Sequence, residues 1–198
     1  MGVYNRKTKE ERLAEIHKAA LELFLTKGYK NTTMEDIIAN TSLSKGGFYH
    51  YYGSTKEILF ALMKQGTYGF VDKNVKMSAP LSKEEVCAIL ANAFIHKILY
   101  TSPERKLFLM FASEIPYDQD FEELYLLLEQ EAFTMIEKVI AMALPGFHLD
   151  RTGSKALFLS KMVNSLVLTQ NMFSDQSIFS NARTQLYDLF YKLCEELF

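Results

Sequence analysis

The chain has 198 residues, of which 48% are hydrophobic and 23% charged, and its formal net charge is −2. This composition is typical of a globular protein with one sizeable core or two modest ones, and it excludes an acidic disordered chain and a wholly basic coat protein. The charge is uneven: residues 1–60 hold nine Lys or Arg against seven Asp or Glu, and the remainder is net negative. The positive end is therefore the candidate for an anionic partner.

The N-terminal residues, the cysteines and the distribution of apolar residues limit the class of protein further. Arg6, Lys7 and Lys9 precede any acidic residue, which indicates either a flexible basic arm or an untethered solvated tail. Cys87 and Cys194 lie far apart without metal-ligand neighbours, so we expect two small buried hydrophobes and no disulfide, as in a reducing compartment. No run of ~18 uncharged apolar residues and no signal-peptide pattern occurs, so we expect a cytoplasmic protein without a membrane partner.

Apolar residues recur at helical spacing along almost the whole chain, and strict alternation flanked by hairpin turns is missing. The sequence therefore predicts an all-α fold of about nine helices. The first three are expected near residues 9–27, 35–40 and 44–51, with Gly28 ending the first. They are too short to stand alone, but together they can enclose a small core of Leu13, Ile16, Phe24, Ile37, Leu43, Phe48 and Tyr52.

Capping signals and prolines divide the rest of the chain. Capping boxes at Ser54–Glu57 and Ser82–Glu85 predict two helix starts. Gly66 and Gly69 weaken the first of these helices, which indicates either a hinge or a site of close helix packing. The further helices are expected near residues 55–77, 82–100, 103–114 (between Pro103 and Pro116), 119–144, 153–173 and 178–197.

The segment from residue 33 to residue 52 carries the functional signal. A short helix, a tight turn and a second short helix, seated on a longer one, form the geometry that places an exposed helix in the major groove of DNA. Ser44, Lys45, Gly46 and Gly47 offer backbone N–H groups, one cation and little bulk, which suits phosphates and base edges. Phe48 and Tyr52 are expected to face inward, which leaves Tyr49, His50 and Tyr51 outward. A generic helical mini-core is the alternative.

The residues themselves resemble the TetR (tetracycline-repressor-like) family of regulators. The likeness covers about 48 residues and rests on many spaced positions: Ile16, Ala20, Leu23-Phe24, Gly28-Tyr29, Thr32-Thr33, Asp36-Ile37, Leu43-Ser44-Lys45-Gly46, Phe48-Tyr49-His50-Tyr51-Tyr52, Glu57 and Leu59. It implies a DNA-binding domain at residues 1–53 and a helical effector-binding and dimerisation domain at residues 54–198. Helix 55–77 would connect the two.

The resemblance also implies particular contacts with DNA. Thr33 would contact a phosphate, and Lys45, Gly46, Tyr49, His50 and Tyr51 would read or grip the major groove.

Four features depart from the family pattern. Thr41-Ser42 replaces the usual Ala-Gly turn, which is therefore expected to be strained. Ile38 replaces a small Ala, and Gly47 replaces a common Thr. Thr55 stands at the usual Lys position, so a phosphate clamp at the start of the helix would have to be made by Lys56.

The helices of the body carry apolar residues on almost all of their faces, so they must be covered on several sides. A solid core would cover them. The resemblance implies instead a cavity for a mostly apolar small molecule, with methionines as adaptable walls. The candidate lining residues are Phe94, Met110, Phe111, Tyr125, Met135, Phe158 and Met162. His96 is expected to be an ordinary surface or core histidine.

The last two helices carry apolar stripes suited to an isologous four-helix interface between two copies of the chain. Closing the monomer's own core is the competing role. The candidate interface residues are Leu166, Leu186, Leu189, Phe190 and Leu193. A dimer is expected because one short recognition helix reads too few bases, whereas a two-fold pair reads two half-sites.

The sequence thus predicts a dimeric regulator of double-stranded operator DNA, a repressor released by a mostly apolar effector. One rival is an effector-independent architectural or division-related DNA binder of the same fold, with broad and salt-dependent binding. The other is a helical enzyme. Four scattered histidines, no Glu-x-x-His pair and no phosphate-cradling loop give no constellation for it, so no catalytic residue, metal or cofactor is expected.

Overall fold

The computed structural model describes residues 7–77, 80–100, 102, 105–148, 154–175 and 177–198. Within these ranges the chain forms ten α-helices and one 3-10 helix and no β-strand, which confirms the all-α prediction. The head holds α1 (Lys9–Lys27), α2 (Met34–Ala39) and α3 (Lys45–Tyr49), and α4 (Thr55–Asn74) leads from it into the body. The body holds α5 (Lys83–Leu99), α6 (Arg105–Glu114), η1 (Ile115–Tyr117), α7 (Gln119–Ala143), α8 (Ser154–Met172), α9 (Ser177–Asn181) and α10 (Arg183–Glu195).

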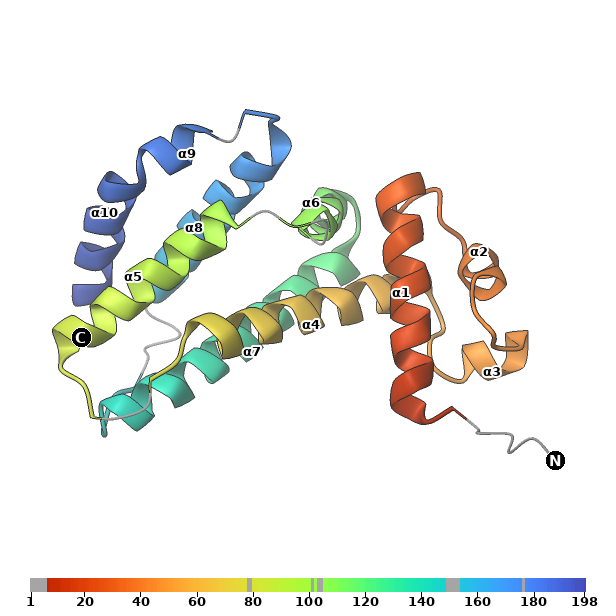
Figure 1. Ribbon diagram of the computed structural model, residues 1–198, viewed down its shortest axis with the longest axis horizontal. Helices are drawn as coiled ribbons and strands as arrows, with labels where there is room; N and C mark the ends of the chain where they lie inside the picture. The colour runs from red at the N-terminus through yellow and green to blue at the C-terminus, as the bar shows by residue number, and fades with distance from the viewer. Residues whose placement is uncertain (1–6, 78–79, 101, 103–104, 149–153, 176) are drawn as a thin grey trace.

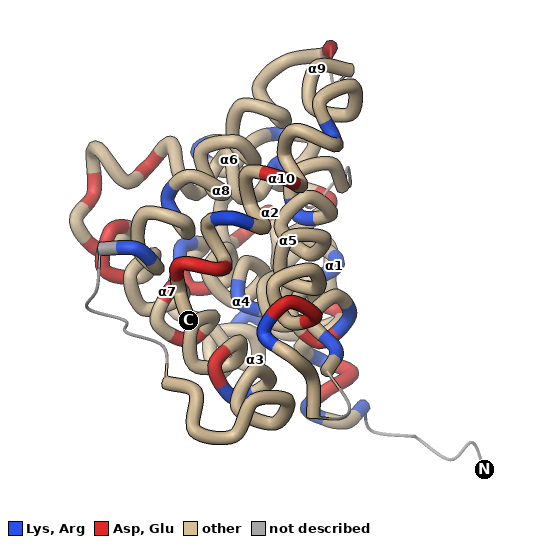
Figure 2. Tube along the Cα trace, turned by 90° about the vertical axis from the view of Figure 1, so that its left-hand side faces the viewer, with Lys and Arg blue, Asp and Glu red and all other residues tan. Residues whose placement is uncertain are grey.

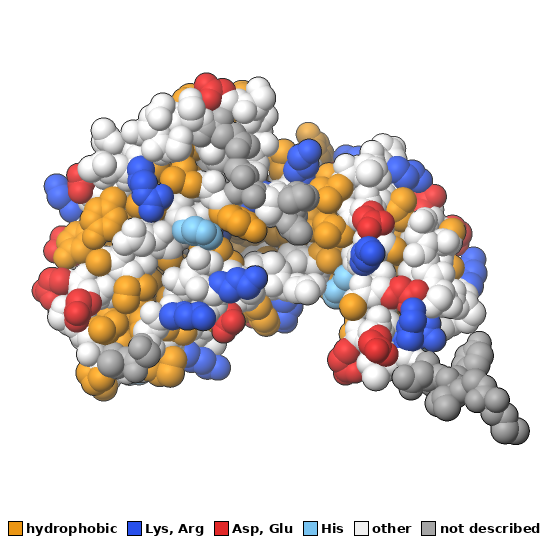
Figure 3. Space-filling model, in the orientation of Figure 1, with side chains coloured by type: hydrophobic (Ala, Val, Ile, Leu, Met, Phe, Trp, Pro, Cys, Tyr) orange, Lys and Arg blue, Asp and Glu red, His pale blue; other side chains and the backbone are white. Residues whose placement is uncertain are grey.

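The head projects from one end of an elongated molecule (Figure 1). α1 crosses the end of α4, and α2 and α3 lie on the far side of α1 from the body. Within the body, α5 packs on α8 and α10, while α4 packs on α7. α6 contacts α1, α4, α7 and α8, so it is the element through which the head meets the body. The surface is indented where the two parts join (Figure 3).

Side-chain caps set most of the helix starts. Thr33 and Ser82 each accept a hydrogen bond from the backbone N–H three residues later, and the carboxylate at that later position accepts from the cap's own N–H, which completes a capping box. The box predicted at Ser54 is half formed. Ser54 Oγ accepts from Glu57 N (3.2 Å), but the Glu57 carboxylate accepts from Gly53 N (2.9 Å) and from the Ser54 hydroxyl (3.4 Å) instead of from the Ser54 backbone N–H.

Several predicted boundaries differ from the structure. α3 ends at Tyr49 and α4 at Asn74, each two or three residues early. The predicted last helix is broken into α9 and α10 next to Asn181, a poor helix former, and Ser180 Oγ there donates to the backbone of Ser177 (2.8 Å). The predicted starts at Pro103 and Gly153, and the basic residue Arg6, lie outside the described residues.

The turn between α2 and α3 is not strained, contrary to the expectation for Thr41-Ser42. Neither residue has a positive φ. The turn is instead held by side chains of the first helix: the Glu15 carboxylate accepts from Ser42 N, and Arg12 Nη1 donates to Ser42 Oγ (3.0 Å). Thr41 Oγ1 donates to the carbonyl of Ile38 (3.0 Å). Serine and threonine therefore replace glycine here by hydrogen bonding and not by tolerance of a left-handed backbone.

Glu15 makes the stability of this turn dependent on pH. Burial raises its pKa, but hydrogen bonds from Lys7 and Ser42 outweigh that effect and lower the pKa to about 2 from 4.5. A carboxylate whose pKa is depressed on folding stabilises the fold above its unfolded pKa and loses that contribution as the pH falls. We expect Glu15→Gln to lower the free energy of unfolding by about 1–3 kcal/mol at pH 7. The difference from wild type should shrink as the pH falls from 4.5 toward 2.

Urea denaturation of both proteins, followed by circular dichroism across that range, measures the effect. Glu22→Gln, at an exposed position on the same helix, is the matched control and should change little at any pH. A constant difference between Glu15→Gln and wild type from pH 7 to pH 3 would show that the carboxylate charge does not hold the turn.

Two apolar clusters account for the core. The head cluster contains the fully buried Ile16, Phe24, Ile37 and Phe48, as predicted, and adds Ile58 and Leu59 of α4. It also includes three buried residues of the body: Leu107, Phe111 and Phe121. The body cluster is formed by α4, α5, α7, α8 and α10. The head cluster therefore extends across the predicted domain boundary at residue 53, because residues of α6 and of the start of α7 complete its packing.

Several smaller expectations can be compared with the structure. Cys87 and Cys194 are free and buried, as predicted, and burial raises their pKa values to about 11 and about 12. A Cβ added at Gly66 or Gly69 would meet no atom within 4 Å, so neither glycine marks close helix packing. None of the described helices is both long and apolar enough to cross a membrane. Acidic and basic residues are interspersed over the body (Figure 2).

Candidate nucleic-acid interface

The short helix α3 presents its first turn to solvent. Ser44 caps it by accepting from Gly47 N (3.3 Å), and Lys45, Gly46 and Gly47 are all exposed. Phe48 is the only fully buried residue of α3, and its side chain fixes the helix on the head cluster. Because the anchor is a single buried ring, the opposite face of α3 stays open along its length.

The two glycines keep this face thin. A Cβ at Gly46 would meet nothing within 4 Å, so the backbone there lies open to an approaching surface. A Cβ at Gly47 would lie 3.2 Å from Ser44 Oγ, which accepts the capping hydrogen bond. Glycine at position 47 therefore leaves the N-cap undisturbed, while the missing threonine removes a hydroxyl from the face.

The aromatic residues after Phe48 divide into two groups. Tyr49 is 40% exposed and His50 is also exposed, as predicted. Tyr51 was expected on the same outward face, but it is half-buried and packs against the head cluster. The reason is that α3 ends at Tyr49, and the chain turns inward as Tyr51 N donates to the carbonyl of Phe48 (2.9 Å). Tyr52 also packs inward, and its hydroxyl lies 2.7 Å from His17 Nε2.

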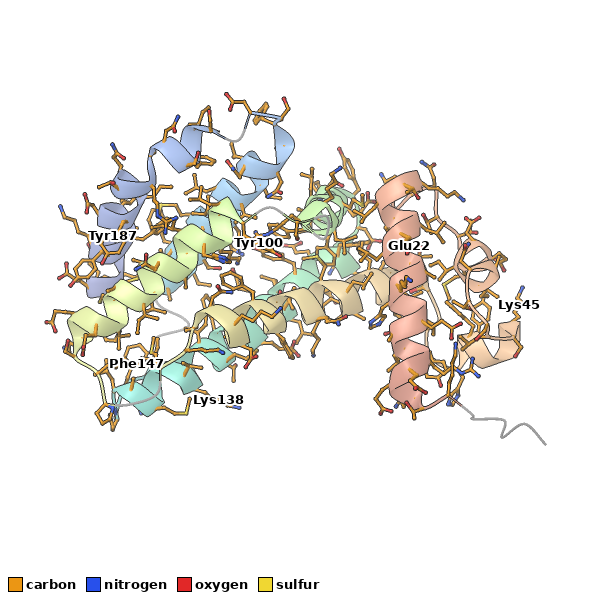
Figure 4. The ribbon with its side chains drawn as sticks, viewed as in Figure 1. Glu22, Lys45, Tyr100, Lys138, Phe147 and Tyr187 are labelled. Atoms are coloured by element: carbon orange, nitrogen blue, oxygen red, sulfur yellow. The ribbon has the colours of Figure 1, made fainter. Side chains whose placement is uncertain are left out.

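Lys45 lies at the outermost edge of the head, away from the body (Figure 4). Its ammonium pairs with Glu35 of α2 (3.1 Å) and lies 5.9 Å from the centre of the Tyr49 ring. The hydrogen bond that Lys45 donates to the Glu35 carboxylate raises the pKa of Lys45 and lowers the pKa of Glu35. Both side chains are largely exposed, so the pair can exchange partners at little cost. Sequence reasoning did not single out Glu35, because its partner is ten residues away.

The two candidate phosphate contacts outside α3 have different surroundings. Thr33 is exposed at the start of α2, where its hydroxyl donates to Asp36 Oδ2 (2.9 Å). Lys56 is bound at the junction of head and body. Its ammonium lies 2.7 Å from both Asp118 Oδ2 and Asp120 Oδ2, at the start of α7, and 5.1 Å from the ring centre of Phe121. A phosphate could reach Lys56 only by displacing two carboxylates.

Comparison with known proteins agrees with this geometry. The sequence profile of the bacterial regulatory proteins of the tetR family matches residues 16–62, from the middle of α1 into α4. YfiR, an HTH-type transcriptional regulator of Bacillus subtilis, is 40% identical over 58 residues, which span 29% of this chain and 28% of YfiR. The head therefore carries a helix-turn-helix of the tetR family. These matches support DNA-binding transcriptional regulation as the function of the chain.

The likeness to this family extends beyond the head. A second HTH-type regulator, from the lacX 3′ region of Lactococcus lactis subsp. lactis, is 28% identical over 208 residues that cover 99% of this chain and all of that protein. A TetR transcription regulator from Haloarcula marismortui shares the fold, with a TM-score of 0.68 at 17% identity over 95% of this chain and 98% of that one. The body of this chain therefore shares the fold of that structure.

The predicted lining residues of the body do not meet at one place. Phe111 is fully buried in the head cluster, and Met110 and Tyr125 pack against that cluster. Phe94, Met135 and Met162 pack against the body cluster. Phe158 is 59% exposed. His96 is exposed, as expected for a surface histidine, and stacks between Phe70 and Tyr100.

The predicted dimer residues also divide. Leu186 and Phe190 are buried in the body cluster, so they close the monomer's own core. Leu166 and Leu193 are half-buried against the same cluster. Leu189 remains 43% exposed. Other large exposed apolar residues on α8, the following loop and α9 are Phe158, Met172, Phe173 and Ile178. Among the described residues, no group of three potential metal ligands is gathered.

Proposed function

We propose that this regulator acts as a homodimer that represses transcription from its operator and is released by a mostly apolar small molecule. The observation that carries the DNA-binding half is the open face of Ser44, Lys45, Gly46, Tyr49 and His50 at the outer end of the head. Its cation, exposed backbone and aromatic edges suit phosphates and base edges in the major groove. Gly47 and Tyr51 would support this face, and Thr33 would bind a phosphate from the start of α2.

The dimer would use the exposed apolar face of α8 and α10. Leu189 would contact the partner directly, with Leu166 and Leu193 beside it, while Leu186 and Phe190 would support the face from within the core. Two copies joined in this way present two α3 helices, and half-sites roughly 34–36 Å apart would match them. Residues 1–53 would then bind DNA, and residues 54–198 would sense and pair.

The route from body to head would be α4 and its contacts with α7. Lys56 binds Asp118 and Asp120 at one end of α4, and Lys64 binds Glu131 (2.6 Å) further along. An effector that moves α7 would therefore pull on α4 at two ion pairs. Displacement of α4 would tilt the head and change the distance between the two α3 helices. Gly66 and Gly69, which have open space around them, leave α4 able to bend.

A titration with candidate small molecules tests the proposal. The full chain is bound to a fluorescent operator duplex, and anisotropy is measured while apolar compounds are added. An effector coupled in this way should weaken operator binding by about 5- to 150-fold, provided that it binds the two states unequally. If every compound that binds the body leaves operator affinity unchanged, the sensing half is wrong. If binding is broad, strongly salt-dependent and indifferent to sequence, the architectural rival is correct.

A further inference from the structure

A layer of polar side chains lies inside the body between α5, α7 and α8. It consists of Lys97, Tyr125, Glu129, Ser160, Lys161 and Asn164. Glu129 of α7 is 9% exposed, and its two carboxylate oxygens accept from Ser160 Oγ (2.6 Å) and Lys161 Nζ (2.9 Å) of α8. The single buried carboxylate of this layer is therefore already paired with a cation.

Two more cations lie in or next to this layer without such a partner. Lys97, near the end of α5, donates to the neutral amide of Asn164 (2.9 Å), which in turn donates to Tyr125 Oη (2.9 Å). Lys97 is half-buried. Desolvation is the main reason why its pKa is lowered to about 8, followed by repulsion from Arg105, and Glu129 offsets only part of the shift.

Arg105 is the first residue of α6. Burial also lowers the pKa of Arg105, and its guanidinium lies 5.6 Å from the ring centre of Tyr100. Tyr100 directly follows α5 (Figure 4). Among the described residues, this guanidinium makes no ion pair and no side-chain hydrogen bond. A cation–π contact is weaker than an ion pair and does not neutralise charge.

Among the described residues, this layer therefore holds more positive than negative charge. Glu129 neutralises Lys161, while Lys97 and Arg105 repel one another across α5 and α6. Desolvated charge without a counterion costs stability, and a folded protein retains it where it serves binding. Apolar side chains flank the two cations: Phe94 and Phe108, each one turn away along the same helix, pack against the body cluster.

We propose that Lys97 and Arg105 bind the negatively charged group of the effector, so that this regulator responds to an organic anion: a carboxylate or a phosphate monoester on an apolar carbon skeleton. The apolar part lies toward Phe94 and Phe108, and the anion supplies the counterion that the layer lacks. This proposal rests on the proposed effector response and names the chemistry of the effector. It adds one charged end to the mostly apolar effector that the sequence predicts.

The competing explanation is that Lys97 is structural and ties α5 to α8 through Asn164. The two explanations differ in the ligand-free protein. If Lys97 is structural, Lys97→Met lowers the melting temperature because a hydrogen bond is lost. If Lys97 awaits an anion, Lys97→Met leaves the melting temperature unchanged or raises it, because an uncompensated charge is removed at nearly constant volume. Lys138→Met, at an exposed position on α7 (Figure 4), is the matched control.

Direct binding completes the test. Isothermal titration of the full chain with octanoate, octyl phosphate and the neutral octanamide, at constant ionic strength, should show that one anion binds at least about 10-fold more tightly than the amide. The preference should disappear in Lys97→Met and in Arg105→Gln, and persist in Lys138→Met. Comparing the affinities of octanoate and octyl phosphate shows whether the site prefers a carboxylate or a phosphate monoester. Equal binding of all three probes, absence of binding, or an anion preference that survives both substitutions overturns the proposal.

The result is independent of the proposed release from DNA. If anions bind through Lys97 but leave operator affinity unchanged, the anion site stands and the effector response fails. If octanamide releases DNA as well as the anions do, the effector response stands and the anion site fails.

Discussion

Lys45→Ala should weaken binding of the full chain to its operator by at least about 10-fold, because a dimer loses the contact twice. Lys45 is the cation at the first turn of α3, and its ammonium lies at the outer edge of the head. The substitution should leave the fold intact, since the side chain is 68% exposed and touches the molecule only through Glu35 and the Tyr49 ring. Fluorescence anisotropy at several salt concentrations gives both the affinity and the salt slope. The slope should fall if Lys45 contacts phosphate.

Substitution of Glu35, the carboxylate beside Lys45, should change operator affinity in the opposite direction. Glu35→Gln removes the acid that holds Lys45 in the free protein and that would repel a phosphate, so operator binding should tighten a few-fold at low salt. Glu22→Gln, which removes the same charge from an exposed position on α1, controls for net charge alone (Figure 4). If Lys45→Ala binds as well as wild type while Glu35→Gln and Glu22→Gln behave alike, α3 does not meet DNA through this face.

Phe111→Ala should destabilise the head even though Phe111 belongs to α6 in the body. The ring is fully buried and lies 5.0 Å from the ring of Phe121, within the cluster that contains Phe24 and Phe48. Removing a buried phenyl ring costs about 3–5 kcal/mol. In a chain of this size each kcal/mol lowers the melting temperature by about 2–4 °C.

Thermal unfolding followed by circular dichroism, together with operator binding as a function of temperature, measures both parts of the molecule. Both readouts should shift downward together in Phe111→Ala. Phe173→Ala removes an equal side chain from a position that is 61% exposed, and should leave both nearly unchanged. A head that loses operator binding at the wild-type temperature while the body melts early would mean that the two parts fold as separate units.

Local signals in the sequence are enough to predict much of this fold. The start of α5 follows from Ser82 and Glu85, and the end of α1 from Gly28, whose φ of 82° no other residue type adopts readily. The helical spacing of Ile16, Phe24, Ile37 and Phe48 correctly identifies the buried side of the head. These features depend on neighbours within one or two turns, which a single sequence contains.

Contacts between distant segments are not visible in such patterns. Lys56 was expected near phosphate, yet it pairs with carboxylates more than sixty residues later, because the start of α7 lies beside the start of α4 and the two helices run in the same direction. Lys97 and Asn164 are likewise 67 residues apart, and each resembles an ordinary polar helix residue in the sequence. The same holds for Glu15 and Ser42, which explains why the turn before α3 was expected to be strained.

The most direct test of DNA recognition by paired α3 helices is selection from a random pool of duplexes by the full chain, followed by sequencing of the bound fraction. We expect enrichment of a two-fold symmetric sequence whose half-site centres lie about 10–10.5 base pairs apart, or a multiple of that spacing. Enrichment of a single unpaired half-site, or no enrichment at all, would contradict it.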